Sequence, residues 1–250
     1  MKARLFIAAL AAAALILPAA AAAQRDTREG RGGERRSDGP DRRDWLSTAQ
    51  RTPEGGFRLG NPDARVKVIE YLSLTCPHCA EFAHQAGPRL FQDYVRSGRV
   101  SIEYRNYTLN GYDLAAAFLS RCAAPREYFD MTHWLLANQP QWMGRMQALT
   151  EAQRNELRAL QPLQAMQRIV QLLGLDRIAT RHGLNAAEQR ACLADQAGLN
   201  QIEQLVQAAR NQHQVTGTPT FVINGQVVQV NDWAGIEPLL RGRERAGQQR

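Results

Sequence analysis

The sequence of 250 residues predicts an α/β fold that is interrupted by a large all-helical insertion. Three observations support this fold class. A segment rich in β-branched and aromatic residues, 66–72, leads directly into helically spaced apolar residues at 79–96. Residues 112–195 contain repeated helix starts and no strand signal. Near the C-terminus, two apolar runs flank Asn224-Gly225, a pattern typical of a β-hairpin.

The first 23 residues have the features of a secretory signal peptide. Lys2 and Arg4 precede an apolar run at 5–17, and small residues follow up to Ala23. The run is shorter than the roughly 20 residues that a membrane-spanning helix needs. We therefore expect cleavage near Ala23 and Gln24 and an exported mature protein, with an uncleaved membrane anchor as the alternative.

The formal net charge of +7 belongs to the two ends of the chain. The signal peptide and residues 24–51 each carry an excess of two positive charges, and residues 241–250 carry an excess of three. Residues 52–240 have no formal net charge. Because no aromatic or groove-reading motif accompanies the arginines, we expect solvated ends and no nucleic-acid binding.

Composition and element order predict the domain organisation. Residues 24–51 are rich in Arg, Gly and Asp and poor in large apolar side chains, so we expect a flexible leader. The other expected parts are a first α/β part at 52–111, a helical insertion at 112–195, a second α/β part at 196–240 and a basic tail at 241–250.

Local signals place further elements. Pro88 predicts a kink in the first helix, Ser97-Gly98 predicts its end, and residues 100–105 alternate as a second strand does. Residues 150–153 and 185–188 each have the spacing of a capping box, in which a short polar side chain and the acid or amide three residues later cap the first turn of a helix.

Cys76 and Cys79 form a C-x-x-C motif directly after the first strand, the context in which this motif carries redox chemistry. A thiolate at a helix N-terminus faces free backbone N–H groups, which lower its pKa. Cys76 is therefore the expected nucleophile and Cys79 the resolving thiol. Pro77 suits the first helical position, and a protonated His78 would stabilise the Cys76 anion further.

Other interpretations of the motif are weaker. A zinc site needs four ligands, and the chain has no second closely spaced cysteine pair. Haem attachment requires histidine after the second cysteine, where this chain has Ala80. We therefore expect no metal and no cofactor. For His78, the alternative is an ordinary exposed helical residue.

The segments from Glu70 to Cys79 and from Gly217 to Gly225 together resemble the DsbA-like branch of the thioredoxin superfamily. The resemblance extends over about 57–240. It implies a thioredoxin fold with an inserted helical domain and a periplasmic thiol-disulfide oxidoreductase that introduces disulfides into exported polypeptides. It also implies re-oxidation by a quinone-linked membrane protein, and we expect a monomer.

Three more positions take expected roles from this resemblance. Glu70 matches the buried acid that moves the proton of the resolving cysteine, and an acid within an apolar strand is costly without such a purpose. A Glu at the sheet edge, pointing to water, is the alternative. Pro219 resembles the cis-proline that faces the cysteine pair, and the backbone of Thr218 would pair with substrate peptide.

Thr218 leaves the direction of the reaction open, because DsbA oxidases typically carry valine at this position, whereas isomerases and reductases of the superfamily use threonine. The first alternative function is therefore an isomerase or reductase that uses the same cysteines. The second is a non-catalytic peptide-binding chaperone.

Cys122 and Cys192 both lie within the expected insertion. An even number of cysteines in an exported chain favours a structural disulfide between them, and some DsbA-like proteins have a second bridge. Two buried free thiols are the alternative.

Overall fold

The computed structural model describes residues 43–246. The expected signal peptide, the leader up to Arg42 and the last four residues lie outside the described residues.

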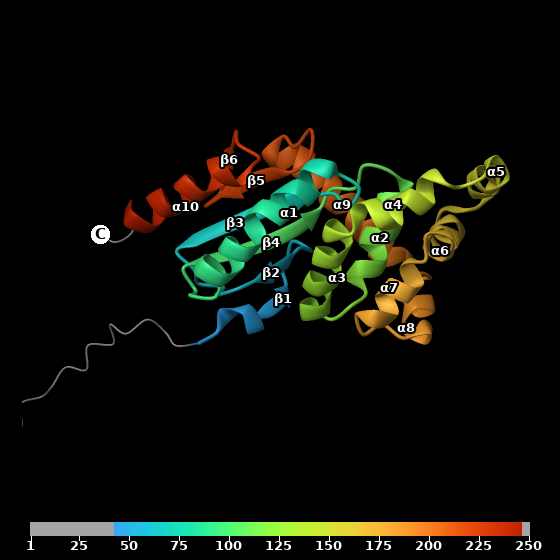
Figure 1. The fold of residues 1–250 in the computed structure, drawn as a ribbon, viewed down its shortest axis with the longest axis horizontal. Coiled ribbons are helices and arrows are strands. Elements are labelled where there is room, and N and C mark those ends of the chain that lie inside the picture. The colour runs from blue at the N-terminus through green and yellow to red at the C-terminus, as the bar shows by residue number, and fades with distance from the viewer. Residues whose placement is uncertain (1–42, 247–250) are drawn as a thin grey trace, which may run out of the picture. The chain divides into compact units, whose positions relative to one another are not determined.

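A six-stranded mixed sheet has the order β1-β2-β4-β3-β5-β6 (Figure 1). The strands are β1 Ala49–Arg51, β2 Phe57–Leu59, β3 Val66–Leu72, β4 Val100–Asn106, β5 Thr220–Ile223 and β6 Gln226–Val228. β3 pairs in parallel with β4 and antiparallel with β5, so it lies at the centre of the sheet. This central place accounts for the burial of most of its residues, with Lys67 as the exposed exception.

Helices cover both faces of the sheet. They are α1 Pro77–Arg89, α2 Gly111–Arg121, α3 Pro125–Ala137, α4 Gln139–Gln147, α5 Glu151–Ala159, α6 Pro162–Leu173, α7 Leu175–Arg181, α8 Ala186–Cys192, α9 Gln196–His213 and α10 Trp233–Ala246. α1, α3 and α10 pack over one face, where Phe82 contacts Phe221 and Trp233. α9 packs over the other face, where Val206 joins Tyr71 and Val222. This is a thioredoxin fold.

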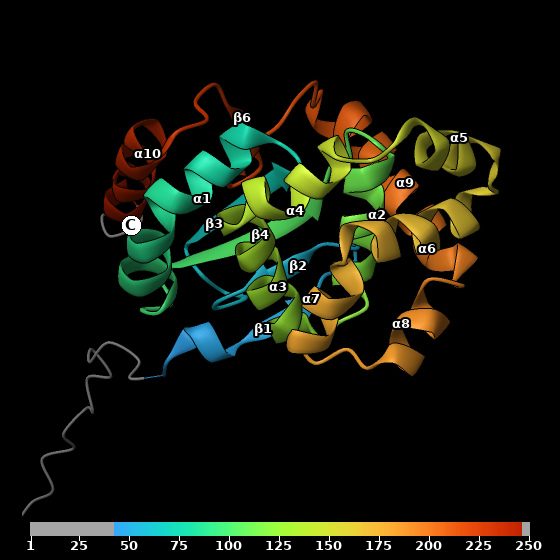
Figure 2. The same ribbon diagram turned by 45° about the vertical axis from the view of Figure 1, so that its right-hand side comes forward.

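The predicted helical insertion lies between β4 and α9. Figures 1 and 2 both show α5 to α8 beyond the end of the sheet that lies away from α10. Of the other inserted helices, α3 packs over the sheet beside α1. Both predicted capping boxes are confirmed, with Thr150 paired to Gln153 and Asn185 paired to Glu188. Within residues 43–246, we find no helix with the length and apolar character that a bilayer crossing requires.

The predicted hairpin is confirmed by its turn. Asn224 and Gly225 have φ angles of 51° and 81°, the positive values that a two-residue turn of this kind requires. The Asn224 side chain also accepts a hydrogen bond from the Lys67 backbone N–H at 2.7 Å. The turn is thereby tied to β3.

The predicted kink at Pro88 takes the form of a widened helix. Proline has no N–H to donate, and α1 passes at Arg89 into a π-helical segment, Leu90–Val95. The Arg96 N–H there donates to the Phe91 carbonyl, five residues earlier, at 2.9 Å. The extra residue per turn lets the chain continue as a helix beyond the proline.

Part of the expected flexible leader is ordered. Residues 45–47 form a 3-10 turn whose Trp45 is buried, and the Trp45 N–H donates to the Arg96 carbonyl at 3.3 Å. β1 follows and pairs with β2 at the edge of the sheet. The expectation of flexibility up to Arg51 is wrong for this part, because burial of one large ring and a strand pairing outweigh the polar composition.

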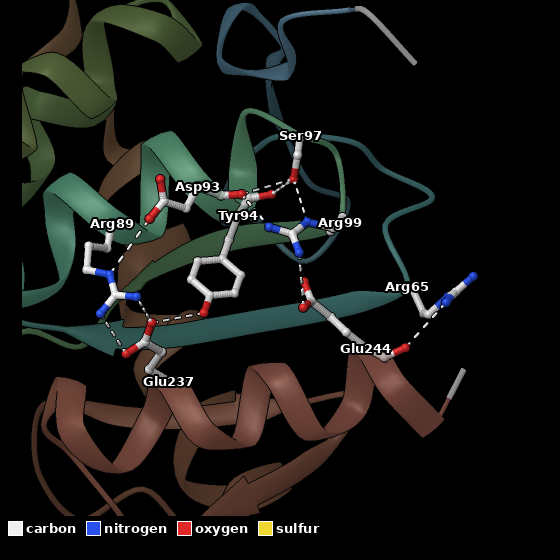
Figure 3. A network of polar contacts seen from close by, with 8 residues as sticks. All are labelled: Arg65, Arg89, Asp93, Tyr94, Ser97, Arg99, Glu237 and Glu244. Atoms are coloured by element: carbon white, nitrogen blue, oxygen red, sulfur yellow. Dashed lines mark hydrogen bonds and ion pairs between the residues drawn. The ribbon is translucent and has the colours of Figure 1, made fainter. Parts of the chain in front are cut away.

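The expected basic tail is likewise helical at its start, because α10 continues to Ala246. Figure 3 shows how its acidic residues contact the neighbouring segments. Glu237 accepts from Arg89 at 2.6 Å and from the Tyr94 hydroxyl at 3.0 Å, and it also pairs with Arg241 at 2.8 Å. Arg241 therefore belongs to the folded helix.

Candidate active site

The Cys76-Cys79 turn joins the centre of the sheet to a helix. Cys76 is the N-cap of α1 with extended backbone angles, and Pro77 occupies the first helical position. The fixed φ of proline suits that position, and its missing N–H costs nothing there. Cys76 is 5 % exposed and Cys79 is fully buried, and both carry free thiols. Only the first sulfur can be approached from outside.

Two side chains of the insertion hold this turn. Asp113, in the first turn of α2, accepts from the Leu74 and Leu109 N–H groups, each at 2.9 Å. Gln139, at the start of α4, donates to the Leu74 carbonyl at 2.8 Å and to the Cys76 carbonyl at 3.0 Å. The position of the nucleophile therefore depends on the insertion as well as on the sheet.

The surroundings of Cys76 favour its anion. A hydrogen bond from the Cys79 thiol, contacts with Thr218 and the backbone N–H groups of Cys79 and His78 lower the pKa of Cys76 to about 5, although burial opposes them. In its thiol form, the Cys76 Sγ donates to the Thr218 carbonyl at 3.1 Å. Cys76 is mostly thiolate at neutral pH.

The Thr218–Pro219 peptide bond is cis and faces the cysteine turn from the start of β5. Pro219 is buried and Thr218 is partly exposed, although the Thr218 hydroxyl oxygen is buried without a hydrogen-bond partner in the described structure. The two segments on which the resemblance rests, 70–79 and 217–225, therefore meet at one place.

Cys79 and Glu70 lie beneath the reactive sulfur and stay protonated. Burial and the hydrogen bond to Cys76 raise the pKa of Cys79 well above its usual value. Burial, together with the charge of Cys76, raises the pKa of Glu70 to about 8. Glu70 is 1 % exposed, which excludes the edge-of-sheet alternative, and its Oε2 has no hydrogen-bond partner in the described structure.

His78 is exposed on the outer side of the turn. After the Cys79 thiol, Thr218 and the Cys79 backbone N–H, the His78 backbone N–H makes a smaller contribution to the lowered pKa of Cys76. No contact between the imidazole ring and the sulfur is found among the described residues. The expected role of the ring in stabilising the Cys76 anion thus remains a prediction.

The second cysteine pair is joined. Cys122 and Cys192 form a disulfide with a Cα–Cα distance of 6.0 Å, which links the end of α2 to the end of α8. Among the described residues, no group of three or more His, Cys, Asp or Glu side chains is arranged to hold a metal ion.

Sequence reasoning missed Asp113 and Gln139. Asn110 caps α2, and an acid three residues after a capping residue is a signal that could have drawn attention to Asp113. No local pattern identifies Gln139, because its two bonds reach residues more than 60 positions earlier in the chain.

Comparison with known families agrees with this geometry. The family model described as Thioredoxin matches residues 52–241, and the chain belongs to that family. The fold and the inserted helices mark it as a DsbA-like member of the thioredoxin superfamily.

Among curated proteins, a putative protein-disulfide oxidoreductase of Rickettsia bellii is 27 % identical over 173 residues, which are 69 % of this chain and 58 % of that protein. The chain thus spans less than two thirds of that relative's length. A protein of the same description from Rickettsia typhi is 28 % identical over 189 residues, covering 75 % of this chain and 60 % of the relative.

Two solved structures share the fold. The protein-disulfide isomerase of Novosphingobium aromaticivorans superposes with a TM-score of 0.70 at 29 % identity, over 75 % of this chain and 96 % of that one. The α-DsbA1 of Wolbachia pipientis superposes with a TM-score of 0.61 at 23 % identity, over 76 % and 90 %.

Proposed function

We propose that this chain is a thiol-disulfide oxidoreductase that introduces disulfides into exported polypeptides through Cys76 and Cys79. The observation that carries the proposal is the opposed ionisation of the two thiols: the pKa of Cys76 is lowered to about 5, and that of Cys79 is raised well above its usual value. A stabilised Cys76 thiolate favours the reduced form of the pair, and the disulfide then becomes a strong oxidant.

The oxidation of a substrate proceeds in two exchanges. A substrate thiolate attacks the Cys76 sulfur of the Cys76–Cys79 disulfide, a mixed disulfide forms, and Cys79 leaves as a thiolate. Glu70, protonated in its buried site, gives its proton to Cys79. A second substrate thiolate then attacks the substrate sulfur of the mixed disulfide, and Cys76 leaves as the stabilised thiolate. The substrate has lost two electrons, and the enzyme pair has gained them.

The cis-proline segment is the proposed place of substrate binding. Thr218 is partly exposed, and its backbone next to Cys76 offers an extended peptide the main-chain partners of an added strand. Such binding relies on main-chain hydrogen bonds and not on particular side chains, so many unfolded polypeptides could bind in this way.

Export, a monomeric state, and re-oxidation by a quinone-linked membrane protein complete the proposal. Export rests on the signal-like residues 1–23. A separate oxidant is required because each turnover leaves Cys76 and Cys79 reduced, and the pair must pass two electrons to an acceptor before it can form its disulfide again.

The equilibrium reduction potential of the Cys76–Cys79 pair against glutathione tests the direction of the reaction. We expect a value near about −120 mV, that of DsbA itself. A value between roughly −180 and −270 mV would assign the chain to isomerase or reductase function. The resemblance to the protein-disulfide isomerase of Novosphingobium aromaticivorans and the residue Thr218 favour this second candidate.

Replacement of the nucleophile tests the site itself. In Cys76→Ser, oxidation of a dithiol peptide should be abolished, and the thiolate absorbance that titrates near pH 5 in the reduced wild type should disappear. Retained oxidation would contradict the assignment. A protein that suppresses aggregation of unfolded chains equally well after replacement of both cysteines, and that oxidises nothing as wild type, would instead be a peptide-binding chaperone.

A further inference from the structure

Once Glu70 has given its proton to Cys79, it must regain a proton before it can act as a proton donor again. The side of the site where substrate binds is a poor route for that proton. Cys79 becomes a thiolate at the moment when substrate is joined to Cys76 and covers the Thr218–Pro219 segment. Cys79 is fully buried, and Glu70 is 1 % exposed. A path from solvent that avoids the substrate would therefore have to reach Glu70 from another side.

Tyr104 lies beside Glu70 on the neighbouring strand. The two residues are register partners in the parallel β3–β4 pair, so their side chains leave the sheet on the same face. Both are buried, and the Tyr104 ring contacts Phe129 and His133 of α3. Glu70 Oε2 has no hydrogen-bond partner in the described structure, and a buried acceptor of this kind calls for a functional or solvent partner.

His133 follows Tyr104 in a series of polar side chains that begins at Glu70 and leads away from the cysteines. The Tyr104 hydroxyl and the His133 Nε2 are hydrogen-bonded at 3.1 Å, and their rings meet edge to face. Nε2 makes the only protein hydrogen bond of this ring among the described residues, so its Nδ1 has no protein partner there. Burial lowers the pKa of His133 to about 4, and the ring is a neutral imidazole that can accept a proton on one nitrogen and release one from the other.

His133 lines a cavity that plays no part in the proposed thiol-disulfide exchange. The cavity has a volume of about 480 Å³ and lies between the outer side of α1 and the helices α3 and α4. Its wall includes His133 and Phe91, with exposed Pro77, Glu81 and His84 on its α1 side. Figure 1 shows α1 between α10 on one side and α3 with α4 on the other. The cavity is therefore on the opposite side of α1 from the β5 segment that receives substrate.

We propose that Glu70 exchanges its proton with solvent through Tyr104 and His133 by way of this cavity. In the oxidising direction, Cys79 thiolate takes the proton of Glu70. Glu70 then regains one from the Tyr104 hydroxyl, directly or through one water molecule, while Tyr104 takes one from His133 Nε2 and His133 Nδ1 takes one from solvent. No charge is left in the core after the cycle. Tyr104 and His133 are positioning residues that act through Glu70.

The charged and titratable groups around this line are few. Around His133, Glu81 and His84 lie across the cavity on α1, Asp130 and Arg126 lie on its own helix, and Tyr104 faces it from β4. Around Glu70, the groups are Cys76 and Cys79 from α1, Tyr104 from β4 and Tyr128 from α3.

The test compares rates with equilibria, because a proton path changes only the former. In a single-turnover oxidation of a dithiol peptide by the oxidised protein, formation of the mixed disulfide should keep its wild-type rate in His133→Ala, because Glu70 starts with its proton. The second exchange should slow by about tenfold or more, because Cys76 must then leave as a thiolate beside a Glu70 that has not regained its proton. Tyr104→Phe, which keeps the ring packing, should show the same loss, and the double variant should show no further loss. The reduction potential and the pKa of Cys76 should stay at their wild-type values. His84→Ala, which alters the same cavity without touching Tyr104, should react at the wild-type rate.

Imidazole in the buffer supplies the decisive readout. It should restore the rate of His133→Ala, more strongly at pH values where both of its forms are present, and should leave Tyr104→Phe slow. Unchanged rates in both variants would overturn the proposal. A slow His133→Ala with a shifted potential and no imidazole effect would also overturn it, because that outcome marks a structural role.

This inference rests on the proposed function, but the two fail differently. If the wild type proves to be a reductase, the same path removes the proton from Cys79, and the same variants should slow disulfide reduction. If wild type and Cys76→Ser are equally inert in both directions, the proposed function is wrong whatever the cavity does.

Discussion

The two cysteine pairs of this chain sit at opposite ends of helices. Cys76 is the N-cap of α1, where free N–H groups and the positive end of the helix dipole favour a thiolate. Cys122 is the C-cap of α2, and Cys192 is the last residue of α8, so both lie where carbonyl groups and the negative end of the dipole disfavour one. One pair carries free thiols, and the other is joined.

The difference shows how the position of a cysteine on a helix affects how easily its disulfide is reduced. Reduction of a disulfide becomes easier as the thiolates it yields become more stable. The pair at 76 and 79 yields one stabilised thiolate, and the pair at 122 and 192 yields none. This difference supports the proposal that the first pair exchanges with substrate, while the second links the end of α2 to the end of α8.

The largest expected effect comes from removing each cysteine pair in turn and comparing the two variants. Replacing both Cys122 and Cys192 with alanine should lower the free energy of unfolding by about 4 kcal/mol, since their bridge closes a separation of 70 residues. Dithiol-peptide oxidation should persist at temperatures well below the unfolding transition. Cys76→Ser should do the opposite, abolishing oxidation without a comparable loss of stability. Urea unfolding and a peptide assay on both proteins measure this, and equal loss of activity in the two would break the comparison.

The second expected effect is a separation of the two reduction steps. In glutathione buffers of falling potential, Cys76–Cys79 should be reduced first, and Cys122–Cys192 should stay oxidised to values below roughly −300 mV. Alkylation followed by mass analysis of the peptides would give the two midpoints. Simultaneous reduction of both pairs would show that helix position does not separate them.

The last expected effect concerns Glu70 alone and is a change of stability with pH. Its folded-state pKa is raised to about 8 from 4.5, so between these values the folded protein retains a proton that the unfolded chain has released. Stability is therefore lost as pH rises, by about 1.4 kcal/mol for each pH unit within this window. Glu70→Gln in the reduced protein should lack this loss. Urea unfolding of both proteins at pH 4, 6 and 8 should give curves that diverge, and parallel curves would contradict the assigned burial.

Elements with a strong local signal could be predicted from the sequence. The C-x-x-C turn, the Asn224-Gly225 hairpin and both capping boxes follow from residues that are adjacent or three apart. The burial of Glu70 was also expected, because a charged residue within an apolar strand is costly without a role.

Features that depend on distant neighbours could not be predicted. β1 is a three-residue strand without an apolar pattern, and its pairing with β2 gives it its conformation. The part of the basic tail that is helical depends on Glu237, which binds Arg89 from the other half of the chain. Gln139 and His133 acquire their contacts only when α3 and α4 pack beside α1.

The strand order has a consequence for how the chain assembles. Val68 of the central strand pairs with Ile102 in its own half of the chain and with Ile223 beyond the whole insertion. Closing the second pairing costs about 1.3 kcal/mol more chain entropy while the intervening residues are unfolded, because the loop between the partners is longer. The packing of α2 on α6 and the Cys122–Cys192 bridge bring the two ends of the insertion together, so a folded insertion shortens the loop that must close. We therefore expect β5 to join β3 after the insertion has folded, and the face on which Thr218 meets Cys76 to form last.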